Sequence, residues 1–409
     1  MNFAKVGGLI DGTGEAPRRD LLLAMNAGRI VDVTSDMVVD PAEREVLDLS
    51  HCWVLPGLVD AHEHLAFEPS PDHASAIATL LGDTPEIALL RAAQHAQQSL
   101  LAGVTTVRDC GGPCLTTLAL RDAIAKGMVT GPTVLASGPA ITTTAGHLHF
   151  LGATADTADE LVKQARRLIE AGADFIKVCL TGGNMTAGTN PYACQYELAD
   201  LARLVKDVHR LGRQVAVHAH ATAGIKLAVR AGVDFVEHCS WASADGGSAY
   251  DEETVRRLAD GPQYATFTFV GIQRALLPDA SGKGGDLARL RENLAVHRRM
   301  VAEGVKFSVA SDAGVRLTPF SGFAQTLEVA VRGADLDPLA AIQAATKAPA
   351  EALGLGNTLG TLEVGKAADF VAVVDNPLTD VRALRHVEAV VKGGQLAVWQ
   401  GRLQPARFG

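Results

Sequence analysis

Cysteine is scarce in this sequence, which has six cysteines in 409 residues and no pair spaced as CxxC. This pattern suggests neither a zinc knuckle nor a disulfide framework. Basic blocks are also missing, and 37 Lys and Arg residues against 46 Asp and Glu residues leave a net charge of −9. Because such an acidic chain is a poor binder of nucleic acid, we expect no nucleic-acid partner.

Long apolar runs are missing as well. No stretch of about 20 uncharged apolar residues occurs, so we expect no membrane span. The opening residues, MNFAKVGG, lack the apolar segment of a secretory signal, and we therefore expect a cytoplasmic protein. What the chain does have is material for a core, since 47% of its residues are hydrophobic. This composition excludes wholesale disorder, and the length suits one large barrel with a small accessory module.

The middle of the chain repeats one pattern. A segment with helical periodicity ends in glycine, and a short β-branched run follows at once. The pattern occurs four times, at 99–107, 169–178, 229–238 and 301–309. Glycine just past a helix supplies a left-handed cap, and short apolar runs are typical of buried parallel strands.

Four further strands are predicted at 54–59, 133–137, 214–217 and 264–269, which gives eight in all. Eight strands alternating with helices predict an α/β fold of the (β/α)8 TIM-barrel type. An open doubly wound sheet is the alternative on periodicity alone. Both ends of the chain instead carry short β patterns with tight turns, at 21–25, 29–33, 369–374 and 387–394. We expect a small β-sandwich from residues 1–55 and 359–409, around a barrel at 56–358.

Polar side chains stand where the predicted strands end, which is where a barrel builds its active site. The first strand runs into His62 and His64, which share one face of an extended segment and can reach one ion. A lone HxH pair is also common among solvated surface histidines. Lys177 lies within the apolar strand FIKVCL, where an ammonium is costly to bury unless it is paired or modified. A lysine that extends to the barrel rim is the alternative.

Later strands add His218 and His220, His238, and Asp312. A single histidine at a strand end is usually a satisfied core residue. After the first strand, four more strand ends bring His, Lys or Asp to the same barrel mouth, which favours a common binding site instead.

These residues resemble the amidohydrolase superfamily. The resemblance rests on VLPGLVDAHEH at 54–64, on Lys177, His218, His238 and Asp312, and on GTLEVGKAADFV at 360–371. The chain is most similar to the prolidase and ochratoxinase-like branch, which is related to imidazolonepropionase.

The resemblance implies two divalent metal ions, with zinc as the expected metal. His62, His64 and Asp312 would hold one ion, and His218 and His238 the other. Lys177, carboxylated by carbon dioxide to a carbamate, would bridge them. A hydroxide shared by the ions would be the nucleophile, and Asp312 would take its proton and pass it to the leaving nitrogen.

Other residues are assigned with alternatives left open. His220 is a candidate for polarising the substrate carbonyl or orienting a ligand, or else a solvated loop residue. His147 is a candidate substrate contact or a solvated histidine, and Tyr192 lies in a Gly-rich loop that could cover substrate or only turn. Arg108 is favoured as part of a structural ion pair across the barrel. The remaining helical and flanking histidines are expected to be solvated: His51, His73, His95, His209, His297 and His386.

The resemblance thus predicts a hydrolase that cleaves an amide bond in a small molecule. The expected substrate is a dipeptide of the Xaa-Pro kind or an N-acyl amino acid. The alternatives are a carbamate, urea, cyclic amide, ester or phosphotriester cleaved in the same site. A non-catalytic scaffold is disfavoured because every expected ligand is present. A homo-oligomer is expected from the family.

Overall fold

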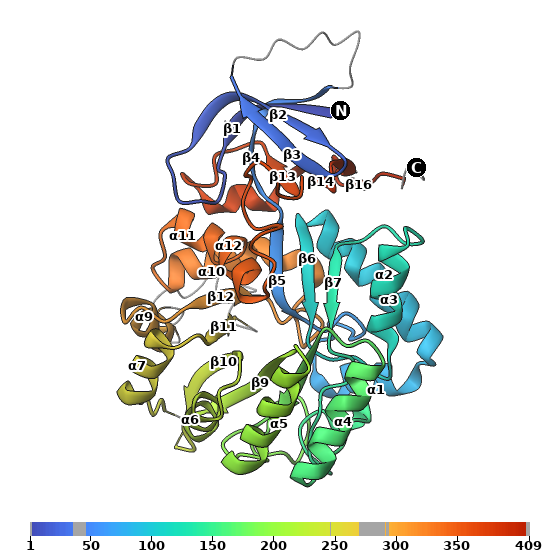
Figure 1. Cartoon of the computed structure of the whole chain (residues 1–409), viewed down its shortest axis with the longest axis vertical. Helices are drawn as coiled ribbons and strands as arrows, with labels where there is room; N and C mark the ends of the chain where they lie inside the picture. The colour runs from blue at the N-terminus through green and yellow to red at the C-terminus, as the bar shows by residue number, and fades with distance from the viewer. Residues whose placement is uncertain (1, 36–45, 246, 270–290, 292–293, 406–409) are drawn as a thin grey trace, which may run out of the picture.

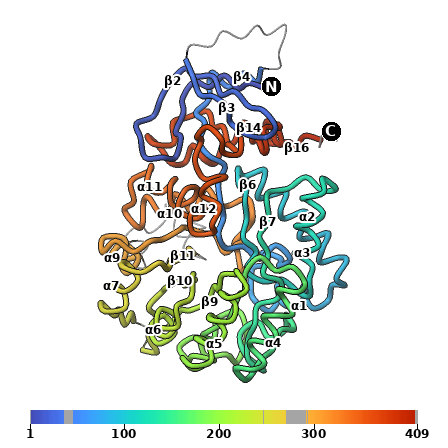
Figure 2. Tube along the Cα trace, in the orientation of Figure 1, coloured from blue at the N-terminus to red at the C-terminus, as the bar shows by residue number. Residues whose placement is uncertain are grey.

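The computed structural model describes residues 2–35, 46–245, 247–269, 291 and 294–405. Strands and helices alternate through the middle of the chain, and strands from both ends form a separate sheet (Figure 1). The result is a mixed α/β fold, as predicted. The N- and C-termini both lie beside the terminal sheet, as the trace in Figure 2 shows.

Two parallel sheets carry the middle of the chain. The first has the order β5-β6-β7 and the second β12-β11-β10-β9-β8. The strands are β5 (Leu58–Glu63), β6 (Val104–Asp109), β7 (Thr133–Ala136), β8 (Phe175–Cys179), β9 (Gln214–Ala221), β10 (Phe235–Ala242), β11 (Tyr264–Thr268) and β12 (Phe307–Ala310). These eight strands correspond to the eight predicted ones, and their neighbours follow chain order.

Backbone hydrogen bonds join the two sheets. The amide of Ile141, just after β7, donates to the carbonyl of Lys177 in β8 at 2.9 Å. On the other side, the amide of Asp312, just after β12, donates to the carbonyl of His62 in β5 at 2.9 Å. The segment after β7 is therefore next to β8, and the segment after β12 is next to β5.

Helices separate these strands in the chain, and three more follow the last strand. They are α1 (His73–Gly82), α2 (Pro85–Leu101), α3 (Thr116–Ala125), α4 (Ala158–Glu170), α5 (Leu198–Arg210), α6 (Thr222–Ala231), α7 (Glu252–Asp260), α9 (Ala295–Ala302), α10 (Phe323–Gly333), α11 (Pro338–Gln343) and α12 (Lys347–Ala352). Gly232 ends α6 with φ +78°, and its amide donates to the carbonyls of Ala228 and Val229. This is the predicted glycine cap, which a side chain would strain.

The terminal sheet has the order β16-β15-β14-β13-β4-β1-β2-β3, so strands of both chain ends lie side by side. Its strands are β1 (Asn2–Leu9), β2 (Arg18–Asn26), β3 (Arg29–Thr34), β4 (Val46–Pro56), β13 (Phe370–Val373), β14 (Val387–Lys392), β15 (Gln395–Trp399) and β16 (Arg402–Leu403). A separate apolar cluster supports it, including Val6, Leu23, Ile30 and Phe370.

The first strand of the middle region begins later than predicted. Residues 54–56 belong to β4 of the terminal sheet, and β5 starts at Leu58. Gly57 separates them, and its amide donates to the carbonyl of Asp369. A Cβ at Gly57 would lie 2.1 Å from the hydroxyl oxygen of Thr105, so only glycine permits this close passage between the sheets.

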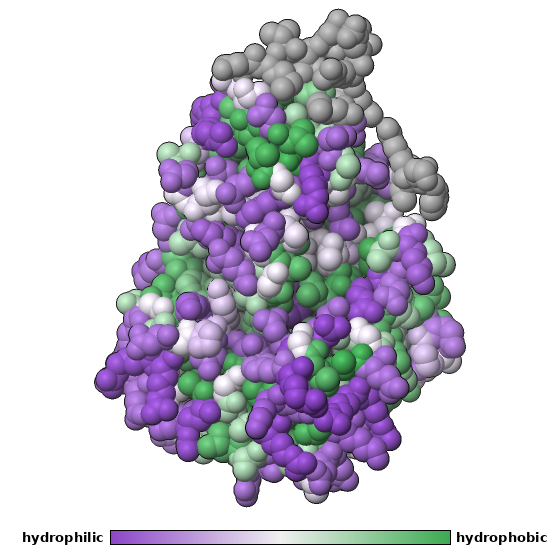
Figure 3. All heavy atoms as spheres, in the orientation of Figure 1, coloured by the Kyte–Doolittle hydropathy of each residue, from purple (hydrophilic) through white to green (hydrophobic). Residues whose placement is uncertain are grey.

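The outer faces of α4 and α5 are polar. Figure 3 shows hydrophilic residues concentrated over the lower part of the visible face, where Figure 1 places α4 and α5. Arg166 of α4 makes an ion pair with Asp207 of α5 on this surface. In the described part of the chain, no helix combines the length and apolar character needed to cross a bilayer.

Candidate active site

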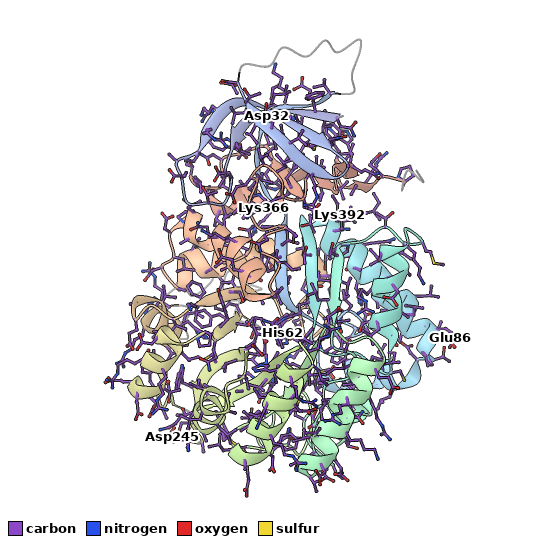
Figure 4. The ribbon with its side chains drawn as sticks, in the orientation of Figure 1. Asp32, His62, Glu86, Asp245, Lys366 and Lys392 are labelled. Carbon is purple, nitrogen blue, oxygen red and sulfur yellow. The ribbon has the colours of Figure 1, made fainter. Side chains whose placement is uncertain are left out.

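A cavity of about 290 Å³ opens at the carboxyl ends of the parallel strands. His62 marks this place near the middle of the molecule in Figure 4, far from the surface residues Glu86 and Asp245. Every residue predicted as a metal ligand lines the cavity: His62, His64, Lys177, His218, His238 and Asp312.

One group of donors surrounds Asp312. Its carboxylate oxygen Oδ1 lies 3.5 Å from His62 Nε2 and 3.4 Å from His64 Nε2. All three side chains are buried. His64 is oriented through its other ring nitrogen, because Nδ1 lies 2.8 Å from the carbonyl of Gly111 and must donate to it. The arrangement leaves the two Nε2 atoms facing one carboxylate oxygen.

A second group consists of His218, His220 and His238. Their candidate ligand atoms, together, lie within 4.8 Å of one another. His238 Nε2 is 2.8 Å from His218 Nδ1, and His220 Nδ1 is 3.0 Å from the hydroxyl of Ser240. His220 therefore belongs to the histidine cluster and is not a solvated loop residue.

Lys177 lies beside the first group. Its side chain is only 2% exposed, and Nζ is 3.4 Å from His62 Nε2. The residues on either side of it in β8, Ile176 and Val178, are fully buried. The lysine thus does not extend to the rim, which excludes the snorkelling alternative.

The electrostatics favour neutral histidines and an ionised aspartate. Burial lowers the pKa of His62 to about 4 and that of His220 to about 4. Burial together with neighbouring histidines lowers the pKa of His218 and His238 well below the usual value. Burial would raise the pKa of Asp312, but His62 and His64 outweigh it and bring that pKa to about 2.

This donor set fits divalent cations. Asp312 Oδ1 is buried and has no hydrogen-bond partner, although a buried anionic oxygen is costly to leave unsatisfied. Neutral imidazole nitrogens and a carboxylate oxygen are the ligands that zinc and similar ions take in proteins. A cation among these atoms would satisfy them together.

Unusual backbone conformations concentrate at the same residues. His238 has φ +68° and Asp312 has φ +57°, and Cys239 and Trp241 also have positive φ. Non-glycine residues pay a conformational cost for this region, and such positions cluster at functional sites. Trp241 is fully buried, and its indole donates to Met300 Sδ at 3.1 Å. The neighbouring packing therefore holds the strained segment in place.

The two predicted substrate contacts differ in position. His147 is buried, lines the cavity, and its ring centre is 4.6 Å from that of His218. Burial lowers its pKa to about 3. Tyr192 is 40% exposed and is not among the described residues that line the cavity. The same loop instead contributes Asn184 and Met185, which the sequence did not single out.

Arg108 forms the predicted buried ion pair across the sheets. Its partner is Glu237 of β10, at 2.5 Å, and both side chains are fully buried. The other oxygen of Glu237 lies 2.7 Å from His62 Nδ1. Sequence reasoning assigned no role to Glu237.

Three of the six histidines expected to be solvated are not. His95 and His297 are buried, and His73 is half-buried in the cavity wall. His95 stacks on Phe320 with ring centres 4.2 Å apart, and His297 Nε2 donates to the carbonyl of His238 at 3.2 Å. The helical spacing of the buried positions Ala88, Ala92, His95 and Ser99 in α2 could have revealed His95. His51, His209 and His386 are exposed, as predicted.

Comparisons with known proteins agree with this site. The model of the amidohydrolase family matches residues 53–397. Ochratoxinase from Aspergillus niger is 29% identical over 425 residues, covering 95% of this chain and 85% of that protein. Imidazolonepropionase from Geobacillus kaustophilus is 27% identical, covering 88% and 85%.

Solved structures show the same relationship. A Xaa-Pro dipeptidase with methionine bound in its active site superposes with a TM-score of 0.84 at 27% identity, covering 97% of this chain and 99% of that one. The crystal structure of A. niger ochratoxinase gives a TM-score of 0.80 at 27% identity, covering 97% and 96%. The chain therefore belongs to the amidohydrolase family, in its prolidase and ochratoxinase-like branch, and is an enzyme that acts on amide and related C–N bonds.

Proposed function

We propose that this protein is a hydrolase that uses two divalent metal ions, zinc being the expected metal, to cleave an amide bond in a small molecule. The observation that carries the proposal is the pairing of two donor groups in one cavity, beside a buried lysine. A volume of about 290 Å³ suits a small-molecule ligand.

In this proposal His62, His64 and Asp312 would hold one ion, and His218 and His238 would hold the other. Lys177 would serve both ions as a carbamate, which forms when Nζ adds to carbon dioxide and loses a proton. The position of Nζ, 3.4 Å from His62 Nε2, supports this role. A free ammonium beside two cations would be repelled and desolvated, whereas a carbamate is an anion.

Two bound cations would supply Lewis-acid activation of the substrate carbonyl and acidify a water molecule. Asp312 accepts the proton that the attacking water loses and returns it to the leaving nitrogen. A carboxylate of low pKa, such as Asp312, can accept this proton if bound cations have already lowered the pKa of the water. Since Ser240 contacts His220 Nδ1, Nε2 of His220 is the nitrogen left to polarise the scissile carbonyl. His147 is positioned to contact the substrate.

The proposed substrate is a dipeptide or an N-acyl amino acid. Support comes from the relatives named as a Xaa-Pro dipeptidase and as ochratoxinase. The cavity wall also includes apolar side chains, Leu148, Met185 and Val315, which suit an apolar acyl or leaving group.

We also propose that the eight parallel strands close into a (β/α)8 barrel, with residues 56–358 as the catalytic domain and 1–55 and 359–409 as a β-sandwich. The hydrogen bonds of Ile141 to Lys177 and of Asp312 to His62 support closure, since they link the sheets on both sides. The strand order has no reversal of the kind that defines a doubly wound sheet.

Metal content by elemental analysis, run beside a substrate panel, tests the function. The panel contains Xaa-Pro dipeptides, N-acyl amino acids, carbamates, esters and phosphotriesters, and His62→Ala serves as the matched variant. We expect two metal ions per chain and turnover of an amide that His62→Ala abolishes. Two ions with turnover of carbamates or esters alone would overturn the substrate class. One ion per active chain would contradict the two-metal mechanism.

A further inference from the structure

Glu237 is a fully buried carboxylate directly behind the cavity. It lies in β10, one residue before His238, and each of its oxygens has a separate partner. Oε1 accepts from Arg108 Nη2 at 2.5 Å, and Oε2 lies 2.7 Å from His62 Nδ1. The always-protonated guanidinium of Arg108 makes Glu237 the ionised partner of a buried ion pair. An ionised carboxylate can only accept, so His62 Nδ1 must carry the proton and donate.

Arg108 is itself fixed on several sides. Its Nε–H donates to the carbonyl of Ala61 at 2.6 Å, next to His62 in the chain. Its guanidinium carbon lies 4.2 Å from the ring centre of Phe235 and 5.2 Å from that of Phe175. The planar cation cannot rotate away from these contacts, so it holds one oxygen of Glu237 and directs the other to His62.

We propose that Glu237 is a positioning residue that holds the His62 imidazole with its proton on Nδ1. The other ring nitrogen, Nε2, then faces Asp312 and Lys177 with a free lone pair that can bind a metal ion. Arg108 enforces this orientation by holding Glu237 in place. Nε2 is the nitrogen 3.5 Å from Asp312 Oδ1 and 3.4 Å from Lys177 Nζ. The consequence for metal affinity rests on the proposed function, but the tautomer itself does not.

Two other roles for Glu237 are less consistent with its contacts. His62, Cys110 and Glu237 are close enough to form a separate cation site. However, Arg108 already occupies Oε1, and burial raises the pKa of the Cys110 thiol to about 12. A purely structural ion pair would account for the contact of Glu237 with Arg108. It would not account for the contact of the second oxygen of Glu237 with His62 Nδ1.

The amide variant Glu237→Gln gives a sharp test. Arg108 only donates, so the glutamine oxygen must turn to Arg108 and its NH₂ group must turn to His62. The ring then has to accept at Nδ1 and carry its proton on Nε2, where a metal ligand needs a lone pair. We expect a 10–100-fold loss of affinity for the first metal ion, measured by chelator competition, as is typical of lost ligand orientation.

A double variant separates positioning from structure. Adding Arg108→Met to Glu237→Gln frees the amide to rotate, so its oxygen can again accept from His62 Nδ1. We therefore expect the double variant to bind the first ion more tightly than Glu237→Gln alone. A structural role predicts the reverse, because the double variant loses more buried contacts.

The matched control is Glu328→Gln. Glu328 of α10 is also a buried glutamate paired with arginines, Arg332 and Arg385, and none of the three is among the described residues that line the cavity. We expect this variant to lose stability and to keep its metal affinity. Equal loss of metal in both Glu→Gln variants would overturn the proposal.

The tautomer can also be read directly in the unmodified, metal-free protein. NMR of ¹⁵N-labelled histidine, with the His62 signals assigned by their loss in His62→Ala, should show the proton on Nδ1. A proton on Nε2 would overturn the proposal whether or not the Glu237 variants fold. A correct tautomer with a single metal ion would leave the positioning role intact and contradict only the two-metal function.

Discussion

The terminal sheet and the carboxyl ends of the parallel strands bury side chains of opposite character. In the sheet, the shared core consists of apolar residues such as Val6, Leu23 and Phe370. At the strand ends, the buried groups are imidazoles, the side chain of Lys177 and the carboxylate of Asp312, which has an oxygen without a hydrogen-bond partner. The first arrangement lowers the free energy of the folded chain, and the second raises it.

This difference identifies the site independently of any relative. Buried polar groups without full hydrogen bonding, together with positive φ at His238 and Asp312, cost stability where the chain could have used apolar residues. A chain retains such costs where they serve a function. The comparison predicts that substitutions at the strand ends change chemistry and that those in the sheet change stability.

The largest effect on chemistry is expected from Lys177→Ala. The variant should lose one or both metal ions and nearly all activity, because it removes the proposed bridge. Acetate or propionate should restore part of the activity by occupying the vacated space, and metal analysis with and without the acid provides the measurement. Lys177→Arg is the matched control and should not respond, since its guanidinium fills the space with positive charge. Full activity of Lys177→Ala without added acid would refute the bridging role.

Asp312→Asn should mainly lower kcat. It removes the proton acceptor, and a general base typically contributes 10²–10⁴-fold, so we expect at least that loss with a smaller change in KM. The loss can be larger because Asp312 is also a proposed ligand. Steady-state kinetics across pH measure the effect, and an unchanged pH–rate profile would count against the role.

Leu23→Ala tests the other half of the comparison. Leu23 of β2 is fully buried in the terminal core, and such truncations cost about 2–5 kcal/mol. We expect that loss in denaturant unfolding, with kcat essentially unchanged at a temperature where the variant stays folded. A large fall in kcat without loss of stability would show that the sheet takes part in catalysis.

A smaller effect is expected from protonation of a buried histidine. Burial lowers the pKa of His95 below its ordinary value of 6.5, so below about pH 6.5 the unfolded chain binds a proton that the folded chain does not. Stability therefore falls on acidification through this window. His95→Gln should show a shallower fall in unfolding free energy between pH 6.5 and pH 5. Equal slopes for the two proteins would contradict the assignment.

Local pattern was sufficient to predict the strand ends and the polar side chains that line the cavity there. A glycine cap such as Gly232 and the apolar run around Lys177 are local signals. The interpretation of Glu237 was beyond reach, because residues alternate across a strand and Glu237 and His238 should face opposite sides. The positive φ of His238 changes the direction of its side chain. A positive φ at a non-glycine residue cannot be predicted from the residue type.

The remaining differences have similar causes. The passage from β4 to β5 at Gly57 depends on Thr105 in a neighbouring strand. The boundary between the two strands could therefore not be predicted from residues 54–59 alone. The loop after β8 brings Asn184 and Met185 to the cavity and leaves Tyr192 exposed. Loop conformation depends on long-range contacts that residue type does not encode.

The most direct test of the central claim is a crystal structure of the metal-loaded, active protein grown with bicarbonate. We predict two metal ions between the His62 and His218 sides of the cavity, and electron density continuing beyond Lys177 Nζ as a carbamate that contacts both. An unmodified Lys177 side chain in a fully metallated and active enzyme would contradict the bridging role and the two-metal mechanism built on it.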